Sequence, residues 1–252
     1  MNKIKEFWNE RAKLGEAAGS NDFLLKNLEQ VLILKTIKEN SRILEIGCGN
    51  GDTLLKLAQE KNCEGMGFDF AEEMVSLARS SAEEQGYGAK LVFEQGKVPG
   101  LPMGIGQFDY ALTERCLINL DSHETQHKAF VEIMSFLKPG GYYLMIESFM
   151  QGLERTNALR SLLNLERIDP PWHNVFMDEN LVTLWATASY ALVDVVPFSS
   201  TYYFLSRVVY AALARDQGEE LRYDSEINLL SCKLPPIGDF GPTRLYLWQR
   251  RP

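Results

Sequence analysis

Residues 42–69 read RILEIGCGNGDTLLKLAQEKNCEGMGFD, and this stretch decides the fold class. A short apolar strand leads into a loop with Gly47, Gly49 and Gly51, an amphipathic helix follows, and a second strand ends at Asp69. Glycine lets the backbone turn sharply and approach a ligand, because a Cβ would block either the turn or the approach. An acid about 20 residues further on is placed to meet a ribose diol. The stretch therefore predicts a site for an adenosine-bearing cofactor at the carboxyl ends of parallel strands.

The residue after this loop indicates which adenosine cofactor is bound. The dinucleotide fingerprint G-x-G-x-x-G needs a third glycine at position 52, where this chain has Asp52. A carboxylate in the first helical turn would lie close to the phosphates that a helix N-terminus otherwise attracts. S-Adenosylmethionine carries adenosine, a sulfonium and an amino-acid tail but no phosphate, so it fits. A NAD-dependent oxidoreductase and a protein that senses the cofactor without catalysis are the alternatives.

The loop E-I-G-C-G-N-G and the acid at Asp69 resemble the first two motifs of class I S-adenosylmethionine-dependent methyltransferases. The resemblance covers about residues 40–150, because four later segments match the family in order and spacing: FAEEMVSLAR, KLVFEQG, QFDYALTE and LKPGGYYLMIE. It implies a Rossmann-like α/β fold, with helices on both faces of a seven-stranded sheet that is parallel except for one antiparallel strand. It also implies S-adenosyl-L-methionine as the cofactor.

The residues expected to hold the cofactor lie at the strand ends and in the N-terminal arm. They are Glu45, Gly47, Gly49, Gly51, Asp69, Phe70, Met74, Gln95, Gly96, Thr113 and Asn21. Most members of the family place an aspartate after the third strand to accept from the adenine amino group, where this chain reads Gln95-Gly96-Lys97. A lysine cannot accept a hydrogen bond. Either the Gln95 side chain or a backbone carbonyl accepts instead, or Lys97 points to solvent.

Composition narrows the class of protein further. The 252 residues carry a formal charge of −8 with a pI near 5.1, which disfavours a large basic surface for nucleic acid. No signal peptide is recognisable at the N-terminus, and the longest apolar region, residues 181–196, is too short and too polar to span a bilayer. The four cysteines show no C-x-x-C spacing and no disulfide framework. These features predict a cytoplasmic protein without nucleic-acid or membrane partners.

The chain is expected to form one domain preceded by a helical arm. Residues 1–40 show helical periodicity with a break at residues 19–22, and residues 41–252 contain the sheet with helical insertions at about 150–189 and 200–236. In the resembling family such an arm folds over the cofactor cleft. Asn21 then reaches the methionine tail, or it and its neighbour only cap the second helix. The arm either closes the cleft or forms a homodimer.

The insertions are expected to choose the methyl acceptor, because loops at the carboxyl ends of the strands form the binding site in this sheet type. Residues 170–174, PPWHN, combine stiffening prolines with an apolar wall and a titratable group. The alternative is a rigid loop whose histidine binds a backbone carbonyl. Tyr202 and Tyr203 line a pocket or belong to the core. The expected acceptor-binding residues are Trp8, Arg115, Trp172, His173, Tyr202 and Tyr203.

Methyl transfer from a sulfonium is an in-line displacement, so positioning supplies much of the acceleration and an acceptor hydroxyl also needs a base. Glu114 and Arg115 follow the fourth strand, where this fold places residues that face the methyl group. Our hypothesis is that Arg115 contacts an anionic group of the acceptor or the cofactor carboxylate, and that His173 or Glu114 is the base. An ion pair and a backbone-orienting role are the alternatives. His123 and His127 mimic a metal-ligand spacing without a third ligand, so no metal is expected.

The leading functional prediction is a methyltransferase that acts on an oxygen or nitrogen of a small molecule. A saccharide, a nucleotide-linked intermediate or a secondary metabolite would be such an acceptor. A protein or RNA methyltransferase that works through a partner surface is the alternative. The sequence after the fourth strand, Thr113-Glu114-Arg115-Cys116, lacks the N/D-P-P-Y type motif, which counts against methylation of nucleobases or glutamine.

Overall fold

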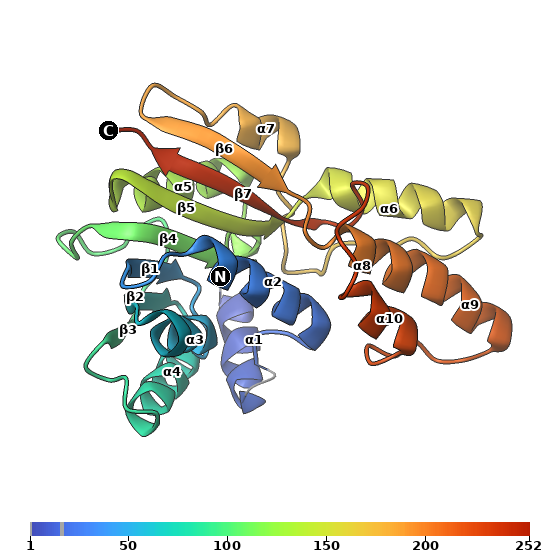
Figure 1. Cartoon of the computed structure of the whole chain (residues 1–252), viewed down its shortest axis with the longest axis horizontal. Helices are drawn as coiled ribbons and strands as arrows, with labels where there is room; N and C mark the ends of the chain where they lie inside the picture. Colours follow the sequence, from blue (N-terminus) through green and yellow to red (C-terminus); the bar gives the residue numbers. More distant parts are fainter. Residues whose placement is uncertain (1, 16–17) are drawn as a thin grey trace.

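A seven-stranded sheet runs through the molecule in the order β3-β2-β1-β4-β5-β7-β6 (Figure 1). The computed structural model describes residues 2–15 and 18–252. The strands are β1 (Arg42–Ile46), β2 (Glu64–Asp69), β3 (Leu91–Gln95), β4 (Phe108–Glu114), β5 (Leu137–Ser148), β6 (Tyr190–Val196) and β7 (Thr243–Arg250). Only β7 runs antiparallel to its neighbours, between β5 and β6. The predicted Rossmann-like sheet with one antiparallel strand is confirmed.

Helices cover both faces of this sheet and extend beyond one end of it. They are α1 (Asn2–Ala12), α2 (Phe23–Thr36), α3 (Asp52–Lys61), α4 (Glu72–Glu84), α5 (His123–Ser135), α6 (Met150–Leu162), α7 (Glu179–Thr183), α8 (Ser200–Phe204), α9 (Tyr210–Gln217) and α10 (Glu226–Ser231). One apolar cluster joins the sheet to α2, α3 and α4. A second joins its other face to α5 and the region of α7. Burial on both faces explains why the central strands read as continuous apolar runs.

The strand register brings the predicted site residues to one edge of the sheet. Ile46, the last residue of β1, pairs with Phe68 of β2 and with Thr113 of β4. The next residues along the three strands are therefore Gly47, Asp69 and Glu114, and they emerge side by side. This edge is the carboxyl end of the parallel strands, where this architecture binds ligands.

The arm and the two insertions surround that edge. The arm forms α1 and α2, and α1 packs against α4. The first insertion contains α6 and α7 with an irregular segment, residues 163–178, between them; this segment returns to the sheet at a bridge between Phe149 and Met177. The second contains α8, a π-helical turn (Leu205–Val209), α9 and α10. Helices α6 and α8 to α10 form a lobe beside the sheet (Figure 1). Within the described residues, no helix has the length and apolar character needed to cross a bilayer.

Candidate functional site

A cavity of about 400 Å³ lies at the carboxyl ends of β1, β2 and β4. Its volume falls in the range of small-molecule and cofactor sites. The glycine loop and the residues after β2, β3 and β4 form its walls, and Ile4 and Trp8 of α1 contribute from the arm. The expected position of the arm over the cofactor cleft is consistent with this placement. The cavity is the candidate site.

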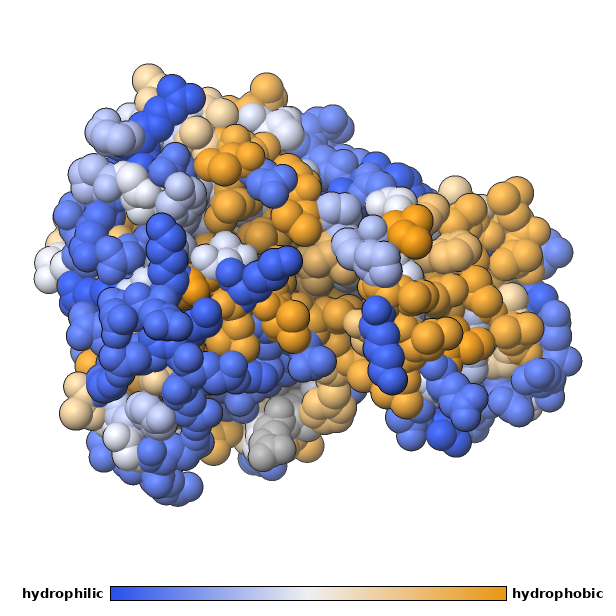
Figure 2. Space-filling view, in the orientation of Figure 1, coloured by the Kyte–Doolittle hydropathy of each residue, from blue (hydrophilic) through white to orange (hydrophobic). Residues whose placement is uncertain are grey.

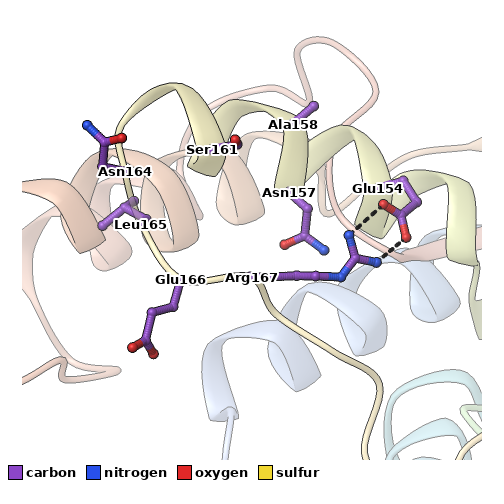
Figure 3. Close-up of a pocket in the computed structure, with 8 residues that line it drawn as sticks. All are labelled: Glu154, Asn157, Ala158, Ser161, Asn164, Leu165, Glu166 and Arg167. Carbon is purple, nitrogen blue, oxygen red and sulfur yellow. Dashed lines mark hydrogen bonds and ion pairs between the residues drawn. The ribbon is translucent and has the colours of Figure 1, made fainter.

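A second hollow lies between α6 and the segment that follows it (Figure 3). Its polar groups already bind one another. Arg167 pairs with Glu154, and the Asn157 side chain donates to the carbonyl of Ile168 and accepts from its amide. None of its lining residues belongs to the first cavity. It therefore offers few convergent polar groups that remain available for a ligand.

The glycine loop brings bare backbone to the wall of the cavity. Gly47 has a φ of +73°, and a Cβ there would lie 2.6 Å from the Cys116 sulfur. Gly49 has a φ of +51°, and a Cβ there would meet open space. The first glycine is therefore required by packing and the second leaves room in front of the loop. Gly51 caps α3 and packs against Phe93, outside the cavity.

Asp69 is fixed in an orientation that suits ribose binding. Its Oδ2 accepts from the Gly49 amide at 3.0 Å and its Oδ1 from the Ala71 amide at 2.8 Å. Burial raises the pKa of this carboxyl, while the backbone amides oppose the shift. A carboxylate has about four acceptor positions, so two amides leave capacity for the two hydroxyls of a ribose. Because Asp69 also lines the cavity, its placement fits an adenosine cofactor.

An apolar slot continues from Asp69 along the cavity. Phe70, Met74, Val98, Pro99 and Leu120 line it, and such side chains suit a purine ring. Two residues after β3 also line the cavity, Gly96 with its backbone and Lys97 with an exposed side chain.

Two polar residues near the apolar slot differ in their placement. The Gln95 amide donates to the Phe70 carbonyl at 3.0 Å, and this side chain does not line the cavity. Asp121 does line it and carries acceptor oxygens. No sequence motif pointed to Asp121.

The carboxyl groups of Glu45 and Glu114 interact near the carboxyl ends of β1 and β4. Glu114 lines the cavity and accepts from the Thr53 hydroxyl at 2.6 Å. Burial raises the pKa of Glu114, and burial together with the charge of Glu114 raises that of Glu45 well above its usual range. Glu45 is only 3% exposed and does not line the cavity. Two neighbouring buried acids do not ionise independently, so a proton shared by the pair is favoured over two negative charges.

Arg115 connects this wall to the arm. Its Nη2 lies 3.1 Å from a Glu29 carboxylate oxygen of α2 and its Nη1 lies 3.4 Å from the Ser20 hydroxyl. Burial raises the pKa of Glu29 to about 8, although Arg115 opposes the shift. The backbone of Arg115 has a φ of +53°, which is unusual for a residue with a Cβ. Arg115 therefore both forms an ion pair and lines the cavity, and among the described residues no group bonds to its buried Nε atom.

Gly19, Asn21 and Asp22 of the polar break in the arm have different roles. Asp22 caps α2 by accepting from the Leu25 amide at 3.1 Å. The Asn21 carbonyl oxygen accepts from Arg11 at 3.0 Å, and Asn21 does not line the cavity. Gly19 is the member of the break that does line it.

Asp52 faces the arm. Its carboxylate lies 2.5 Å from the Lys26 Nζ and accepts from the Gln30 amide at 3.0 Å. These contacts tie α3 to α2, and Asp52 does not line the cavity.

Tyr202 ties the lobe to the arm. Its hydroxyl, almost fully buried, donates to Asp22 at 2.6 Å, and Arg207 donates to the other oxygen of the same carboxylate at 2.7 Å. Tyr203 is half-buried with its hydroxyl 3.4 Å from the Thr243 hydroxyl. Neither tyrosine lines the cavity.

Replacing Tyr202 with phenylalanine should lower the free energy of unfolding by about 1–2 kcal/mol, because a buried hydrogen bond to a carboxylate is lost. Urea unfolding monitored by circular dichroism measures this loss. Tyr203→Phe is the matched control with a smaller expected effect, since its hydrogen bond is longer. Equal stability of wild type and Tyr202→Phe would contradict the proposed tie.

Trp8, Trp172 and His173 meet in one aromatic cluster with Phe7. The ring centroid of His173 lies 4.6 Å from Phe7, 6.0 Å from Trp8 and 5.2 Å from Trp172. Of these, only Trp8 lines the cavity, so His173 lies one layer behind it. Burial and the nearby Arg11 lower the pKa of His173, and its Nδ1 is buried without a hydrogen-bond partner. The cluster fastens α1 to the segment of residues 163–178.

Asn119 and the turn after β4 complete the wall next to Trp8. Asn119 accepts from the Trp8 indole and from the Asn174 amide, each at 3.3 Å. Cys116 and Leu120 of the same turn also line the cavity. The sequence pointed to the stretch of residues 113–120 after the fourth strand, but of its members only Thr113, Glu114 and Arg115 were assigned roles. Thr113 lies inside the sheet, where its hydroxyl bonds to Tyr143 at 2.8 Å.

The Glu147 side chain of β5 accepts hydrogen bonds from the backbone of this turn. One of its carboxylate oxygens accepts from the amides of Cys116 and Leu117 at 3.1 and 3.0 Å, and the other from Ile118 at 3.4 Å. Glu147 is fully buried, and burial raises its pKa to about 7 against the effect of these amides. The turn that carries three cavity residues therefore depends on one buried carboxyl.

A family model described as a methyltransferase domain matches residues 37–174, more than half of the chain. The chain belongs to the class I S-adenosylmethionine-dependent methyltransferases. This methyltransferase thus uses S-adenosyl-L-methionine, and the cavity, the glycine loop and Asp69 fit that cofactor. Among its described residues, no group of three or more His, Cys, Asp or Glu side chains is arranged to hold a metal ion.

Curated relatives and solved structures agree with this family. The methyltransferase is 27% identical over 122 residues to demethylmenaquinone methyltransferase of Bacillus velezensis, covering 48% of this chain and 51% of the relative. It is 29% identical over 96 residues to ajmaline N-methyltransferase of Rauvolfia serpentina, covering 38% and 33%. The match therefore spans a third to a half of these relatives. A Geobacter sulfurreducens S-adenosylmethionine-dependent methyltransferase in complex with S-adenosyl-L-homocysteine shares the fold, with a TM-score of 0.54, 16% identity and coverage of 90% and 91%.

Proposed function

We propose that this methyltransferase transfers a methyl group to an oxygen or nitrogen atom of a small molecule. The observation that carries the proposal is that Trp8 of α1 and Asn119 of the turn after β4 both line the cavity and are joined by a hydrogen bond, while Asn174 bonds to Asn119 from behind. The acceptor side is thus bounded by α1 and this turn, which the segment of residues 163–178 supports. An enclosed wall suits a small acceptor better than an extended RNA or protein surface.

Two further observations support a small acceptor. The curated relatives named above include an ajmaline N-methyltransferase and a demethylmenaquinone methyltransferase, and the names of both specify small molecules. The formal charge of −8 disfavours a phosphate backbone as the partner. We place the protein in the cytoplasm because all four cysteines are free, as a reducing compartment requires.

We assign the base to Glu114. It lines the cavity, and burial raises its pKa, which makes its carboxylate a stronger base. His173 is neutral near pH 7 but is separated from the cavity by Trp8. Arg115, whose Nε lacks a partner, is placed to contact the cofactor carboxylate or an anionic acceptor group. The cofactor, when bound, supplies the activated methyl group.

The function is tested by cofactor binding followed by an acceptor screen. Isothermal titration should show binding of S-adenosylmethionine and S-adenosylhomocysteine and no binding of NAD. Small alcohols, phenols and amines are then screened with S-adenosylhomocysteine release as the readout. Transfer confined to protein or RNA fractions would overturn the small-molecule proposal, and binding of NAD alone would overturn the choice of cofactor.

With an acceptor in hand, Glu114→Gln should lower turnover by about 100-fold or more, because general base catalysis typically contributes that much. Its affinity for S-adenosylmethionine should change little, since glutamine keeps an acceptor for the Thr53 hydroxyl. His173→Gln is the comparison variant and should keep turnover within a few-fold. A large loss of turnover in His173→Gln with a small one in Glu114→Gln would reverse the assignment.

A further inference from the structure

The lobe carries an apolar surface on the face formed by α9, α10 and the segment between them. Figure 2 shows this surface gathered on the side of the molecule where α9 and α10 lie in Figure 1. Its large apolar side chains are between 42% and 60% exposed. They are Leu213, Leu221, Tyr223, Leu229, Leu230 and Leu234, and we call them the α9–α10 face.

Helix α10 of this face buries polar residues and exposes its leucines, the reverse of the usual amphipathic pattern. In α10 the residues that face the lobe are Asn228 and Ser231, which are 1% and 2% exposed, while Leu229 and Leu230 are 44% and 54% exposed. Helix α9 buries Tyr210, Ala211 and Ala214 and exposes Leu213 beside this face. A surface helix of a globular protein normally turns its leucines toward the core. The inversion indicates that a second surface covers these leucines.

The size of the α9–α10 face matches one half of a protein interface. Six large side chains that are about half exposed present on the order of 500 Å² of apolar surface, which equals the largest apolar patch of a typical monomer, and such patches are often functional. A standard interface buries about 800 Å² on each partner, of which somewhat more than half is apolar. The face therefore supplies the apolar area that one stable dimer contact needs.

Charges on α10 favour a second copy of this chain as the partner. Glu226 is the first residue of α10, and Lys233 lies in the turn directly after its last residue, Ser231, so opposite charges flank the exposed leucines of this helix. Both are exposed, and neither forms an ion pair with any part of the chain that the structure describes. In a two-fold contact each residue meets its complement on the other copy. Antiparallel α10 helices would thus place Glu226 against Lys233 of the partner subunit, twice.

A lipid surface fits the same face less well. Membrane-surface helices carry basic side chains around their apolar face, which attract anionic headgroups. Between residues 213 and 237 acids outnumber bases by five to three. The acids are Asp216, Glu219, Glu220, Asp224 and Glu226, and the bases are Arg215, Arg222 and Lys233.

We propose that the α9–α10 face is the contact between two copies of this chain, related by a two-fold axis that passes close to Leu230. The leucines of the two copies cover one another, and the Glu226 and Lys233 pairs fix the antiparallel register. None of the residues of this face lines the cofactor cavity, so both cavities stay outside the contact. The proposal does not rest on the identity of the methyl acceptor.

Sedimentation velocity of the full chain over a wide range of concentration tests this dimer. Wild type should sediment as a dimer, and Leu230→Glu should raise the dissociation constant by about 100-fold or more, since it buries a charge at the centre of the contact. Leu184→Glu is the matched control, because Leu184 is 76% exposed and lies next to α7, away from the lobe. Unchanged circular dichroism and S-adenosylmethionine affinity in Leu230→Glu would show that the fold is intact.

A charge reversal tests the register. Glu226→Lys alone should raise the dissociation constant by about 10-fold, and adding Lys233→Glu should restore it, because the pairs form again in reversed order. A wild-type monomer at all concentrations would overturn the proposal, as would a dimer that is unaffected by Leu230→Glu. Binding of wild type to vesicles of phosphatidylcholine and phosphatidylglycerol that is lost in Leu230→Glu would overturn it in favour of a lipid surface.

Discussion

Replacing Asp69 with alanine should weaken binding of S-adenosylmethionine by about 100-fold or more, because hydrogen bonds to a charged group contribute about 1.5–3 kcal/mol each and two ribose hydroxyls would lose their acceptor. The same change releases the Gly49 and Ala71 amides, which the carboxylate holds at 3.0 and 2.8 Å. The glycine loop then loses its support as well as its ligand contact. Isothermal titration of the full chain measures the change.

Two variants separate the roles of charge and of fold in this experiment. Asp69→Asn keeps the size of the side chain but has one acceptor oxygen, so it should fall between wild type and alanine, at about a 10-fold loss. Glu72→Ala removes an exposed acid from the first turn of α4, near Asp69 in sequence, and should leave the affinity unchanged. An Asp69→Ala affinity within a few-fold of wild type would move ribose recognition to another residue.

The sheet and the cofactor end of the site could be predicted because their determinants are local. A buried strand reads as an apolar run, and a loop that must adopt positive φ angles requires glycine. Gly47, Gly49 and Asp69 lie within 23 residues of one another in sequence, and strand pairing alone brings them together. The strands, the glycine loop and the acid could therefore be predicted without knowledge of the tertiary packing.

The acceptor end could not be predicted in the same way because it depends on contacts between distant segments. His173 and Trp172 lie next to Phe7 across more than 160 residues of sequence, and nothing in either segment indicates this pairing. Tyr202 binds Asp22, 180 residues away. Both contacts depend on how the arm docks on the insertions. From sequence, a histidine beside a tryptophan indicated an acceptor-binding site. In the structure, His173 belongs instead to an aromatic cluster behind the cavity wall.

The individual roles in the turn after β4 could not be predicted for a related reason. The sequence indicates that residues 113–120 face the site, but the orientation of Asn119 and Leu120 toward the cavity depends on the Glu147 carboxyl about 30 residues later. From sequence, Glu147 is only the acidic end of an apolar strand. The structure gives it a specific task, since three consecutive amides converge on it.

Replacing Glu147 with alanine should lower the free energy of unfolding by about 3 kcal/mol or more, because three buried amides lose their acceptor and each unsatisfied group costs about 1–3 kcal/mol. The affinity for S-adenosylmethionine should fall too, since Leu120 and Cys116 line the cavity. Urea unfolding and isothermal titration measure the two effects. Glu132→Ala is a matched control, because this carboxylate also accepts backbone amides, those of Gly100 and Leu101, but at an exposed loop.

Glu147→Gln adds a pH signature that simple loss of packing does not produce. Burial raises the pKa of Glu147 in the folded protein to about 7 from a usual value of 4.5, so the folded state binds a proton more tightly than the unfolded chain. Stability from this group is then complete below about pH 4.5 and is lost as pH rises through 7, by up to about 3 kcal/mol. Glutamine does not titrate, so the stability of wild type relative to Glu147→Gln should decline over this window. A difference that stays constant from pH 5 to 8, measured by urea unfolding, would mean that the carboxyl is ionised throughout, and that the three amides outweigh the cost of its burial.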